Sequence, residues 1–362
     1  MFADLISADD PRWSRALERI PHDVYHRPEY ARFAARHEGG VAAAFLAQGE
    51  GRQMLIPLLL KPLPPQLGAP DAWQDATSAY GYPGPIASHP DDDGWLQACR
   101  TKLYELASAH GIVAAFVRLH PLHGIPAERL RSYGAIVEHG PIVYLELTKD
   151  PAVLAAEMRK NHRRDIQRLA QAGFTASVDD WGAYPSFASL YRATMDRVAA
   201  QRFYYFSDEY FADLERMLQG HLHICAVRAP DGQLAAAGLF FETDGLIQYH
   251  LGGTAPAHLP QSPSKLMFGA VAGWGRSIGA RLMHLGGGTG GHCDSLYQFK
   301  SGFSRSRALF HTLRMVFNEH AYSRLAQAWR DGSSAEEAAA DYFPIYRQPS
   351  SAPYGEVKAC TT

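Results

Sequence analysis

The feature of this sequence that most constrains its fold is an order of secondary structure that occurs twice. In the first half, hydrophobic periodicity predicts a helix at 29–37, a hairpin at 41–47 and 54–60, a strand at 77–86, a helix at 94–110 and a strand at 112–119. In the second half it predicts a helix at 207–219, a hairpin at 223–228 and 234–242, a strand at 246–252, a helix at 264–278 and a strand at 281–285. The shared order indicates an internal duplication.

Hairpins followed by a strand, a helix and another strand are typical of mixed sheets with helices on their faces. We therefore expect an α/β fold with α+β mixed sheets and two similar domains. The 362 residues exceed the ~250–300 at which a single core stops growing, which also favours two domains. The halves join near 147–151, so the expected domains are residues 1–148 and residues 149–362.

The composition narrows the possible partners and sites. The net charge is only −2, so any anion-binding function must come from local clusters of Lys and Arg. The four cysteines show no CxxC spacing, which argues against a structural zinc site, and we expect no metal. The first residues, MFADLISADDPRW, do not resemble a secretion signal, and no apolar run is long enough to span a membrane, so a cytoplasmic protein is expected.

The junction between the halves carries a basic segment. Apolar residues of AVLAAEMRKNHRRDIQRLAQAG recur at helical spacing, and Gly173 is a plausible stop, so a helix is expected over 152–173. Lys160, Arg164 and Arg168 fall at i, i+4 and i+8 and form one basic stripe. Such a stripe is either a solvated face or a set of phosphate ligands. After Asp331, a short Ala/Glu-rich helix and then an extended segment are expected.

Several motifs, in a fixed order, resemble the Fem-type (FemAB-like) branch of the GNAT superfamily of N-acyltransferases. They are VYHRPEYARF, AYGYPGPI, RKNHRRDIQRLAQAGF, SPSKLMFGAVAGW, GGGTGG followed by DSLYQFKSGFS, and DYFPIYR. The resemblance implies two tandem GNAT-like domains, with the transfer site in the C-terminal one. It implies an enzyme that forms an amide bond by moving an aminoacyl group from aminoacyl-tRNA to an amine of a small molecule or peptide.

The resemblance leaves other readings open. Some relatives use acyl-CoA as the donor, and a catalytically silent module that binds polysaccharide or a protein is a further alternative. No cofactor is expected beyond the co-substrate, aminoacyl-tRNA or acyl-CoA. Two departures from the family are visible. First, the segment EYARFA has Ala34 where several members that use a UDP-linked acceptor have a lysine, which makes such an acceptor doubtful. Second, no heptad pattern predicts a coiled-coil arm.

The donor site is predicted around Phe299 and Lys300, because in the Fem family this Phe-Lys pair lies beside the acceptor end of the tRNA. Lysine is a compact charge that can neutralise a phosphate or a developing oxyanion. No acidic residue occurs from Ser295 to Asn318, so Arg305 and Arg307 add positive charge there, unless they are solvated positions of a last strand. The Asn-x-Arg-Arg signature adds Arg163 and Arg164 as donor-binding candidates.

The glycine run GGGTGG is not a nucleotide-binding P-loop, since no Gly-Lys-Ser/Thr ending follows. The glycines are interpreted as sites of close backbone approach. The pyrophosphate loop typical of GNAT enzymes has no clear match, which favours tRNA over acetyl-CoA. His292 and Cys293 invite a metal site or a thiol nucleophile, but neither has the further ligands or the geometry that such chemistry needs.

The remaining candidates concern catalysis and the acceptor. Asp294 is predicted to orient the amine or Lys300, or else to cap its loop, and His250 is either a proton acceptor or a packed strand histidine. Amide formation from an activated ester can rely on positioning and needs no strong base. The predicted acceptor-binding residues are Arg202, Tyr204, Tyr205, Tyr249 and Tyr297.

Overall fold

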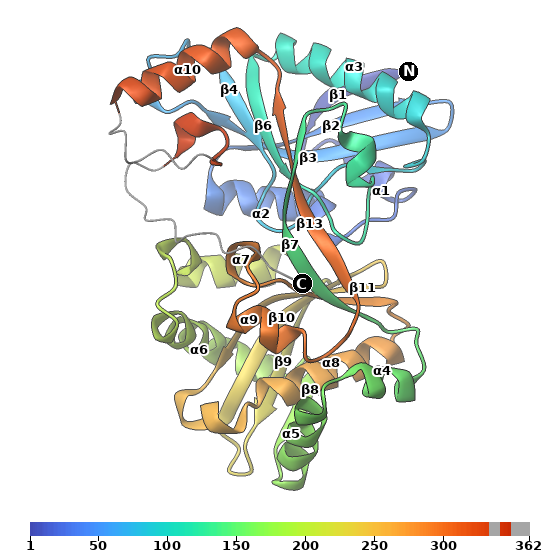
Figure 1. The fold of residues 1–362 in the computed structure, drawn as a ribbon, viewed down its shortest axis with the longest axis vertical. Coiled ribbons are helices and arrows are strands. Elements are labelled where there is room, and N and C mark those ends of the chain that lie inside the picture. The colour runs from blue at the N-terminus through green and yellow to red at the C-terminus, as the bar shows by residue number, and fades with distance from the viewer. Residues whose placement is uncertain (333–340, 349–362) are drawn as a thin grey trace. The chain divides into compact units, whose positions relative to one another are not determined.

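The computed structural model describes residues 1–332 and 341–348 and divides the chain into two units (Figure 1). Unit 1 contains residues 1–140 and the described residues from Leu309 onward, and unit 2 contains residues 141–308. The strands β7 (Ala135–Glu146) and β13 (Arg307–Val316) each have residues in both units. The expected boundary at 148/149 differs from this division, because most of β13 pairs with a strand of the first half.

The sheet of unit 1 has the order β1-β2-β3-β4-β6-β13, and β5 pairs with β3. Its other strands are β1 (Phe2–Ser7), β2 (Val41–Gly49), β3 (Arg52–Pro62), β4 (Gln74–Thr77), β5 (Ile86–Ala87) and β6 (Ile112–Arg118). Its helices are α1 (Pro11–Leu17), η1 (Val24–His26), α2 (Pro28–Glu38), η2 (Pro65–Leu67), α3 (Asp93–Ala109), η3 (Ala127–Leu130), α10 (Glu319–Gly332) and η8 (Ile345–Arg347).

Local sequence explains the hairpin of unit 1. The strands β2 and β3 pair from Val41↔Leu60 to Gly49↔Arg52, and the turn consists of Glu50 and Gly51, both with positive φ. This two-residue turn has the twist that antiparallel strands favour. The expected strand at 77–86 is wrong: only β4 and β5 form there, because Gly81 has a φ of +101° and Pro83 cannot donate to a ladder.

The helix α3 covers one side of this sheet and supplies much of the core of unit 1. It buries Trp95, Leu96, Cys99 and Leu103 in one apolar cluster with strand residues such as Ile56. The C-terminal described segment, 341–348, is attached to the same unit by a buried carboxylate. Asp75 accepts hydrogen bonds from Tyr346 Oη at 2.8 Å and from Arg347 Nε at 2.5 Å.

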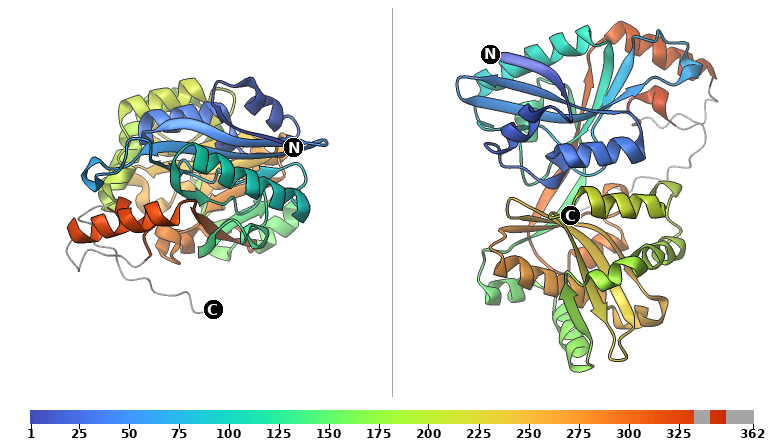
Figure 2. Two further views of the ribbon diagram at one scale, coloured as in Figure 1. Left: turned by 90° about the horizontal axis from the view of Figure 1, so that it is seen from above. Right: turned by 180° about the vertical axis from the view of Figure 1, so that it is seen from behind.

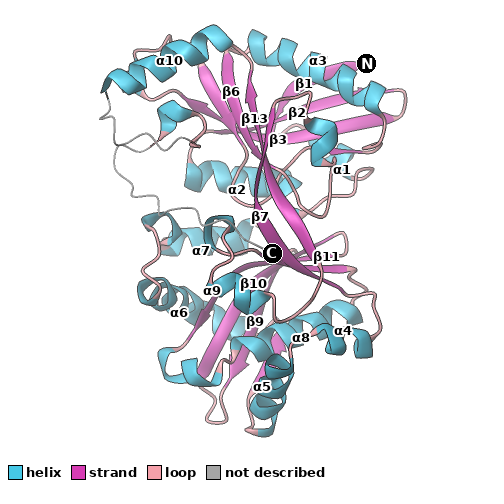
Figure 3. Cartoon of the chain, viewed as in Figure 1, coloured by secondary structure: helices cyan, strands magenta, loops and turns pink. Residues whose placement is uncertain are grey.

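The sheet of unit 2 has the order β7-β12-β11-β10-β9-β8, drawn in magenta in Figure 3. Its further strands are β8 (Thr175–Val178), β9 (Leu222–Arg228), β10 (Leu234–Thr243), β11 (Leu246–Thr254) and β12 (Leu282–Gly286). Its helices are α4 (Pro151–Glu157), α5 (Lys160–Gln171), η4 (Trp181–Ala183), α6 (Tyr184–Arg197), η5 (Arg202–Tyr204), α7 (Asp208–Met217), η6 (Pro256–Gln261), α8 (Ser264–Ser277), η7 (Thr289–Gly291) and α9 (Ser295–Lys300).

The two units share one order of elements, which confirms the predicted duplication and the mixed α/β class. Apart from the two-residue β5, the order in unit 1 is β2-β3-β4-α3-β6, and in unit 2 it is β9-β10-β11-α8-β12. In both, the strands on either side of the helix pair in parallel, whereas the hairpin is antiparallel. The described helices of unit 2 are at most 14 residues long, so no coiled-coil arm is present among them.

Helices cover both faces of the sheet in unit 2 (Figures 1 and 2). On one face, Phe268 of α8 packs on Phe240. On the other face, Phe241 lies against His250, whose ring reaches Tyr210 of α7. Successive strand residues such as Phe240 and Phe241 therefore serve different layers, as the pleat requires.

The basic segment at the junction is two helices, so the expected single helix over 152–173 is wrong. Met158 has extended backbone angles, φ −67° and ψ 136°, and separates α4 from α5. The break lets the N–H of Arg159 bond to the carbonyl of Gly302 at 2.9 Å, a contact that periodicity cannot reveal. The expected stop is confirmed, since Gly173 adopts a φ of +85° just after α5.

Two expectations concern other parts of the chain. In the part that the structure describes, no helix combines the length and the apolar character that crossing a bilayer requires. The Ala/Glu-rich helix expected after Asp331 falls at 333–340, outside the described residues, whereas α10 ends at Gly332.

Candidate functional site

Two neighbouring strands of unit 2 part shortly after they begin to pair. The parallel ladder between β11 and β12 consists of Leu246↔Leu282, Ile247↔Met283 and Gln248↔His284, although β11 continues to Thr254. Beyond the ladder, β11 contains an extra residue relative to β10, because Leu251 faces Leu239 while Tyr249 faces Phe240. The bulge therefore falls at His250, and bulges commonly redirect a strand next to a functional site.

Lys300 lies where these strands part. It is the last residue of α9, and its Nζ donates a hydrogen bond to the carbonyl of Gly287 at 2.8 Å, one residue beyond β12. The same Nζ lies 5.6 Å from the ring centre of Tyr249, one residue beyond the ladder on β11. Lys300 is only 7% exposed, and this burial lowers its pKa to about 8, with the charge of Asp294 acting in the opposite direction.

Asp294 holds the loop that leads to Lys300. Its side chain caps α9 by accepting the N–H of Tyr297 at 2.9 Å, and it also accepts the N–H of Thr289 at 2.9 Å. Burial acts to raise its pKa, but these hydrogen bonds and the charge of Lys300 outweigh burial and lower it. A side chain at Gly288 would overlap Asp294 and the carbonyl of His292, so this glycine is required for the close approach.

The first turn of α5 holds the segment around Phe299. His162 is buried, its Nε2 lies 3.0 Å from the carbonyl of Phe299, and its ring packs on Phe303 with centres 4.7 Å apart. A side chain at Gly302 would overlap the same imidazole. Arg159 Nη2 donates to Ser301 Oγ at 2.8 Å. Lys300 is thus fixed by contacts on both sides of it in sequence.

Phe299 itself is half-buried. Its ring packs on Phe268 and Phe303, with centres 6.0 Å and 5.4 Å away. Tyr297, two residues earlier, receives a hydrogen bond at 3.0 Å from Arg307 Nε. Arg307 also donates to the backbone carbonyls of Ser304 and Ser306, so its charge is committed to the loop.

The other basic candidates face solvent to different extents. Arg305 is exposed. On α5, the side chain of Arg164 is 74% exposed, whereas Arg163 donates to the carbonyl of Ala155. The predicted basic stripe is present, since Lys160, Arg164 and Arg168 lie at i, i+4 and i+8 of α5 and are all exposed.

A buried ion pair attaches α5 to α8. Lys265 Nζ lies 2.6 Å from Asp165 Oδ2, and both residues are buried. The hydrogen bond and charge of Lys265 lower the pKa of Asp165 despite a counteracting effect of burial. The inner face of α5 is therefore fixed to the domain. On its exposed face, Arg164 and Arg168 lie 3.6 Å and 3.5 Å from Asp165 Oδ1.

His250 and Tyr249 point to opposite faces of the sheet. Tyr249 packs on Phe268 of α8, with ring centres 4.9 Å apart, on the side of Lys300. His250 is buried on the other side, with Nε2 3.1 Å from Tyr210 Oη. Burial lowers its pKa to about 3, so the ring is neutral at pH 7. His250 as a proton acceptor remains a prediction, and its side chain lies on the face opposite Lys300.

The acceptor-binding candidates of the segment before α7 form a separate group. Arg202 and Tyr205 are exposed, and the carbonyl of Tyr204 accepts a hydrogen bond from Tyr191 Oη at 2.9 Å. The role of these three residues in acceptor binding also remains a prediction.

The structure therefore brings six predicted residues around one loop and adds others. The six are Tyr249, Asp294, Tyr297, Phe299, Lys300 and Arg307. Sequence reasoning did not single out His162, Gly302 or the carbonyl of Gly287. His162 lies inside the quoted motif RKNHRRDIQRLAQAGF, but nothing in its spacing indicates a contact with a residue 137 positions later.

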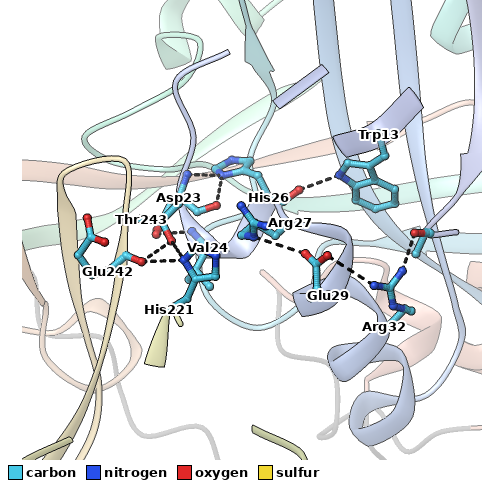
Figure 4. A network of polar contacts seen from close by, with 11 residues as sticks. Trp13, Asp23, Val24, His26, Arg27, Glu29, Arg32, His221, Glu242 and Thr243 are labelled. Atoms are coloured by element: carbon cyan, nitrogen blue, oxygen red, sulfur yellow. Dashed lines mark hydrogen bonds and ion pairs between the residues drawn. The ribbon is translucent and has the colours of Figure 1, made fainter. Parts of the chain in front are cut away.

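Unit 1 contains a buried polar network of its own (Figure 4). Trp13 Nε1 donates to the carbonyl of His26 at 2.8 Å, and the N–H of Asp23 donates to His26 Nδ1 at 3.1 Å. Asp23 Oδ2 lies 3.1 Å from His120 Nε2. Burial lowers the pKa of His26 to about 3, which keeps this ring neutral. The network satisfies the polar groups of η1.

Figure 4 also shows a pair of contacts within unit 2, where His221 Nδ1 lies 3.0 Å from the carbonyl of Glu242 and 3.2 Å from Thr243 Oγ1. Across the described residues, no group of three His, Cys, Asp or Glu side chains is arranged to hold a metal ion.

A family comparison identifies the domain that carries Lys300. Residues 156–301 match the model of the acetyltransferase (GNAT) domain. Most of unit 2 is similar to a GNAT domain. The split strands and α9 lie within the matched part. No curated protein matches the sequence.

Solved structures extend the similarity from the GNAT domain to nearly the whole chain. FemX is similar with a TM-score of 0.70 and 14% identity, over 89% of this chain and 99% of its own. L-PGS from Bacillus licheniformis is similar with a TM-score of 0.52 and 12% identity, over 85% of this chain and 92% of its own. A C-terminal domain of a putative lysylphosphatidylglycerol synthetase from Agrobacterium fabrum has a TM-score of 0.52 and 14% identity, with coverage of 86% and 92%. The predicted Fem-type fold is confirmed.

Proposed function

We propose that this chain is a Fem-type N-acyltransferase that moves an aminoacyl group from aminoacyl-tRNA to the amine of a small molecule or peptide. The observation that carries the proposal is the position of the Lys300 ammonium, between β11 and the end of β12, where the two strands part. The fold of FemX and the GNAT match support this reading. Such a donor would place the reaction in the cytoplasm, and no further cofactor is required.

The reaction needs few catalytic groups. The uncharged amine nitrogen attacks the carbonyl carbon of the aminoacyl ester, a C–N bond forms, and the C–O bond to the terminal ribose breaks. The amine loses a proton and the ribose oxygen gains one. In this scheme the Lys300 ammonium stabilises the negative charge that develops on the carbonyl oxygen, and burial strengthens this interaction because little water competes.

The surroundings of Lys300 suit the end of a tRNA. Phe299 is half-buried and offers part of an aromatic face on which a terminal base could stack. The exposed cations Lys160, Arg164 and Arg168 on α5 could bind phosphates, with Arg164 and Arg168 exchanging their long contacts with Asp165 for a phosphate. These groups are held next to each other because His162 and Arg159, in the first turn of α5, bind the segment 299–302.

One observation favours a second candidate, an acyl-CoA donor: the matched family model describes acetyltransferases. The full chain should be incubated with charged total tRNA or with a set of acyl-CoAs, in each case with a pool of candidate amines. We expect transfer that ribonuclease abolishes. Transfer that survives ribonuclease and requires CoA would establish the second candidate instead.

A control separates both enzymes from a non-catalytic binding module. Lys300→Ala should lower transfer on the order of 100-fold or more, as the loss of one charge-stabilising group does in comparable sites. A binding module would show no transfer with any donor and would bind its ligand equally well after this substitution.

A further inference from the structure

Unit 1 has its own pair of parting parallel strands, and an arginine lies at the opening. The pairing of β4 with β6 ends at Thr77↔Phe116, and the N–H of Ser78 adds a last bond to the carbonyl of Phe116 at 2.8 Å. Arg118, the last residue of β6, donates its backbone N–H to Ser78 Oγ at 3.0 Å. Ligands commonly bind at the carboxyl ends of parallel strands, which is where Arg118 lies.

Within the described part of the chain, the guanidinium of Arg118 donates hydrogen bonds from one of its nitrogens. Its Nη1 donates to the carbonyl of Ser78 at 3.1 Å and approaches the carbonyl of Ala79 at 3.5 Å. Within residues 1–332 and 341–348, Nε and Nη2 make no hydrogen bond, and no carboxylate lies within 4.0 Å of the group. Neither nitrogen is enclosed by protein, and the residue is half-buried.

The unused edge has a defined chemistry. The Nε and Nη2 hydrogens of a guanidinium point in parallel and match the two oxygens of a carboxylate or a phosphate. The contacts of Nη1 with the backbone hold this edge in place, and the ring of Phe116, whose centre is 5.0 Å from Arg118 Cζ, supports the guanidinium plane. The guanidinium of Arg118 is therefore already held in the orientation that a bidentate ligand needs before the ligand binds.

The nearby charges leave the edge of Arg118 available. Glu38 is the carboxylate whose charge acts on this region, and its oxygens accept the N–H of Tyr80 at 2.9 Å and 3.2 Å. Burial raises the pKa of Glu38, against the effects of the Tyr80 hydrogen bond and the charge of Arg118. Burial and then the charges of Arg314 and Arg118 lower the pKa of His139. The local balance therefore favours an anion.

We propose that Arg118 is the core of an oxyanion-binding site in unit 1, which takes a carboxylate or phosphate group of the amine acceptor. The identification of the ligand as the acceptor rests on the proposed function, but the binding of an oxyanion does not. This assignment gives unit 1 a role in substrate binding, while the GNAT domain of unit 2 carries Lys300.

Equilibrium binding to the full chain tests the site without any donor. The probes are alanyl-alanine against its C-terminal amide, and glycerol 3-phosphate against glycerol, each followed by NMR titration. We expect saturable binding of alanyl-alanine or glycerol 3-phosphate, and none of the neutral partner. The probe that binds identifies the oxyanion as carboxylate or phosphate.

Two substitutions and a control locate the binding. Arg118→Gln removes the charge and should weaken binding by at least about tenfold, as the loss of a charged hydrogen bond predicts. Arg118→Lys keeps a charge and a donor for Ser78 but lacks the fork, and it should also weaken binding while the unfolding temperature stays the same. Arg52→Gln, at a surface arginine of the same unit paired with Glu50 and Asp92, should bind like the parent chain.

Failure of the site and failure of the proposed function are distinguishable. The inference is overturned if neither charged probe binds, or if folded Arg118→Gln and Arg118→Lys chains bind as well as the parent. The tRNA transfer assay is separate, so an oxyanion site that is confirmed alongside absent transfer would contradict only the proposed function.

Discussion

Lys300 is a buried cation in surroundings that oppose its charge. Its only hydrogen bond within the described residues is to the carbonyl of Gly287, and the carboxylate of Asp294 is occupied by two backbone N–H groups. Burial lowers its pKa to about 8, close to the pH of the cell, although the charge of Asp294 acts in the opposite direction. At this position a small change in pH changes the fraction of ammonium, which is the form that can stabilise an oxyanion.

The pH dependence of transfer follows from this shift. As the pH rises through about 8, Lys300 loses its proton, so its contribution to kcat/KM should fall. Lys300→Arg stays charged throughout and should show no such fall. We therefore expect the ratio of kcat/KM for Lys300→Arg to that for the parent chain to increase from about pH 7 to about pH 9. A constant ratio would show that the charge of Lys300 does not act in the transfer.

Gly302 is a residue whose missing side chain matters. Gly302→Ala would push a methyl group into the imidazole of His162, which is itself packed on Phe303. We expect a loss of about 1–3 kcal/mol in the free energy of unfolding, measured in urea, because a packed core cannot yield easily. Transfer should fall as well, since the same histidine binds the carbonyl of Phe299.

The matched control is Gly273→Ala on α8, where nothing lies within 4 Å of the added methyl group. Its free energy of unfolding should increase by up to about 1 kcal/mol, because alanine favours a helix over glycine. An equal response of the two glycines would contradict the packing of His162 on Gly302.

At the scale of elements, α9 is a six-residue helix that could not form alone and depends on its cap. Asp294 supplies this cap and also holds the turn that begins at Thr289. The glycine run before it serves this turn, with positive φ at Gly286, Gly290 and Gly291. The sequence correctly suggested close backbone approach for this run, but could not show that the loop closes around a carboxylate.

Substitutions at Asp294 distinguish a cap from a catalytic charge. Asp294→Ala should lower the free energy of unfolding by about 1 kcal/mol and reduce transfer, because Lys300 is the last residue of the helix it caps. Asp294→Ser keeps a capping oxygen and should retain most of the stability and the transfer. If the Asp294→Ser chain kept the full free energy of unfolding but lost transfer, the charge of Asp294 would instead have a catalytic role.

The control for this pair is Asp150→Ala, which removes the cap of α4. A comparable loss of stability without loss of transfer is the expected result.

The pKa of Asp294 is lowered in the folded protein. Its contribution to the free energy of unfolding is therefore present above the ordinary pKa of an aspartate, and it is lost as the pH falls below that value.

The outer face of α5 gives a second prediction at this scale. Lys160→Gln, Arg164→Gln and Arg168→Gln, combined, should raise the KM for charged tRNA. The slope of log KM against log salt should decrease by about 0.7–0.9 for each phosphate that these side chains no longer neutralise. The same change at Arg324 and Arg330 on α10 of unit 1 is the control and should leave the slope unchanged. An unchanged slope in the α5 variant would exclude this face from RNA binding.

At the scale of the whole molecule, the sequence predicts the class and the duplication but not the division of the chain. The repeated order of elements was visible because hairpins, helices and buried strands have distinct periodicities. A last strand at Arg305 and Arg307 was one of two alternatives, but its pairing with β6 was not predicted. This pairing, Leu313↔Val117 for example, joins residues about 200 positions apart in sequence. Hydrophobic periodicity carries no information on such pairing. It also cannot show the bulge in β11, which determines the face of the sheet toward which the His250 side chain points.

The division of the chain can be tested with fragments. A fragment of residues 1–148 lacks β13, whose Leu313 and Met315 are buried in the core of unit 1, so it should remain unfolded or aggregate. A fragment of residues 141–308 contains all of unit 2 and should unfold cooperatively. Far-UV circular dichroism and limited proteolysis would measure both. A cooperatively folded 1–148 fragment would contradict the assignment of β13 to unit 1.

The pairing of β13 with a strand of unit 1 reverses the usual order in which domains complete folding during synthesis. Domains generally fold in the order in which they are synthesised. Here unit 2 is complete once residue 308 has left the exit tunnel, whereas β6 of unit 1 must wait for residues 312–316 with one edge unpaired. The half that is made first is therefore the half that finishes last, and until residues 312–316 are made its unpaired strand edge is open to pairing with another chain.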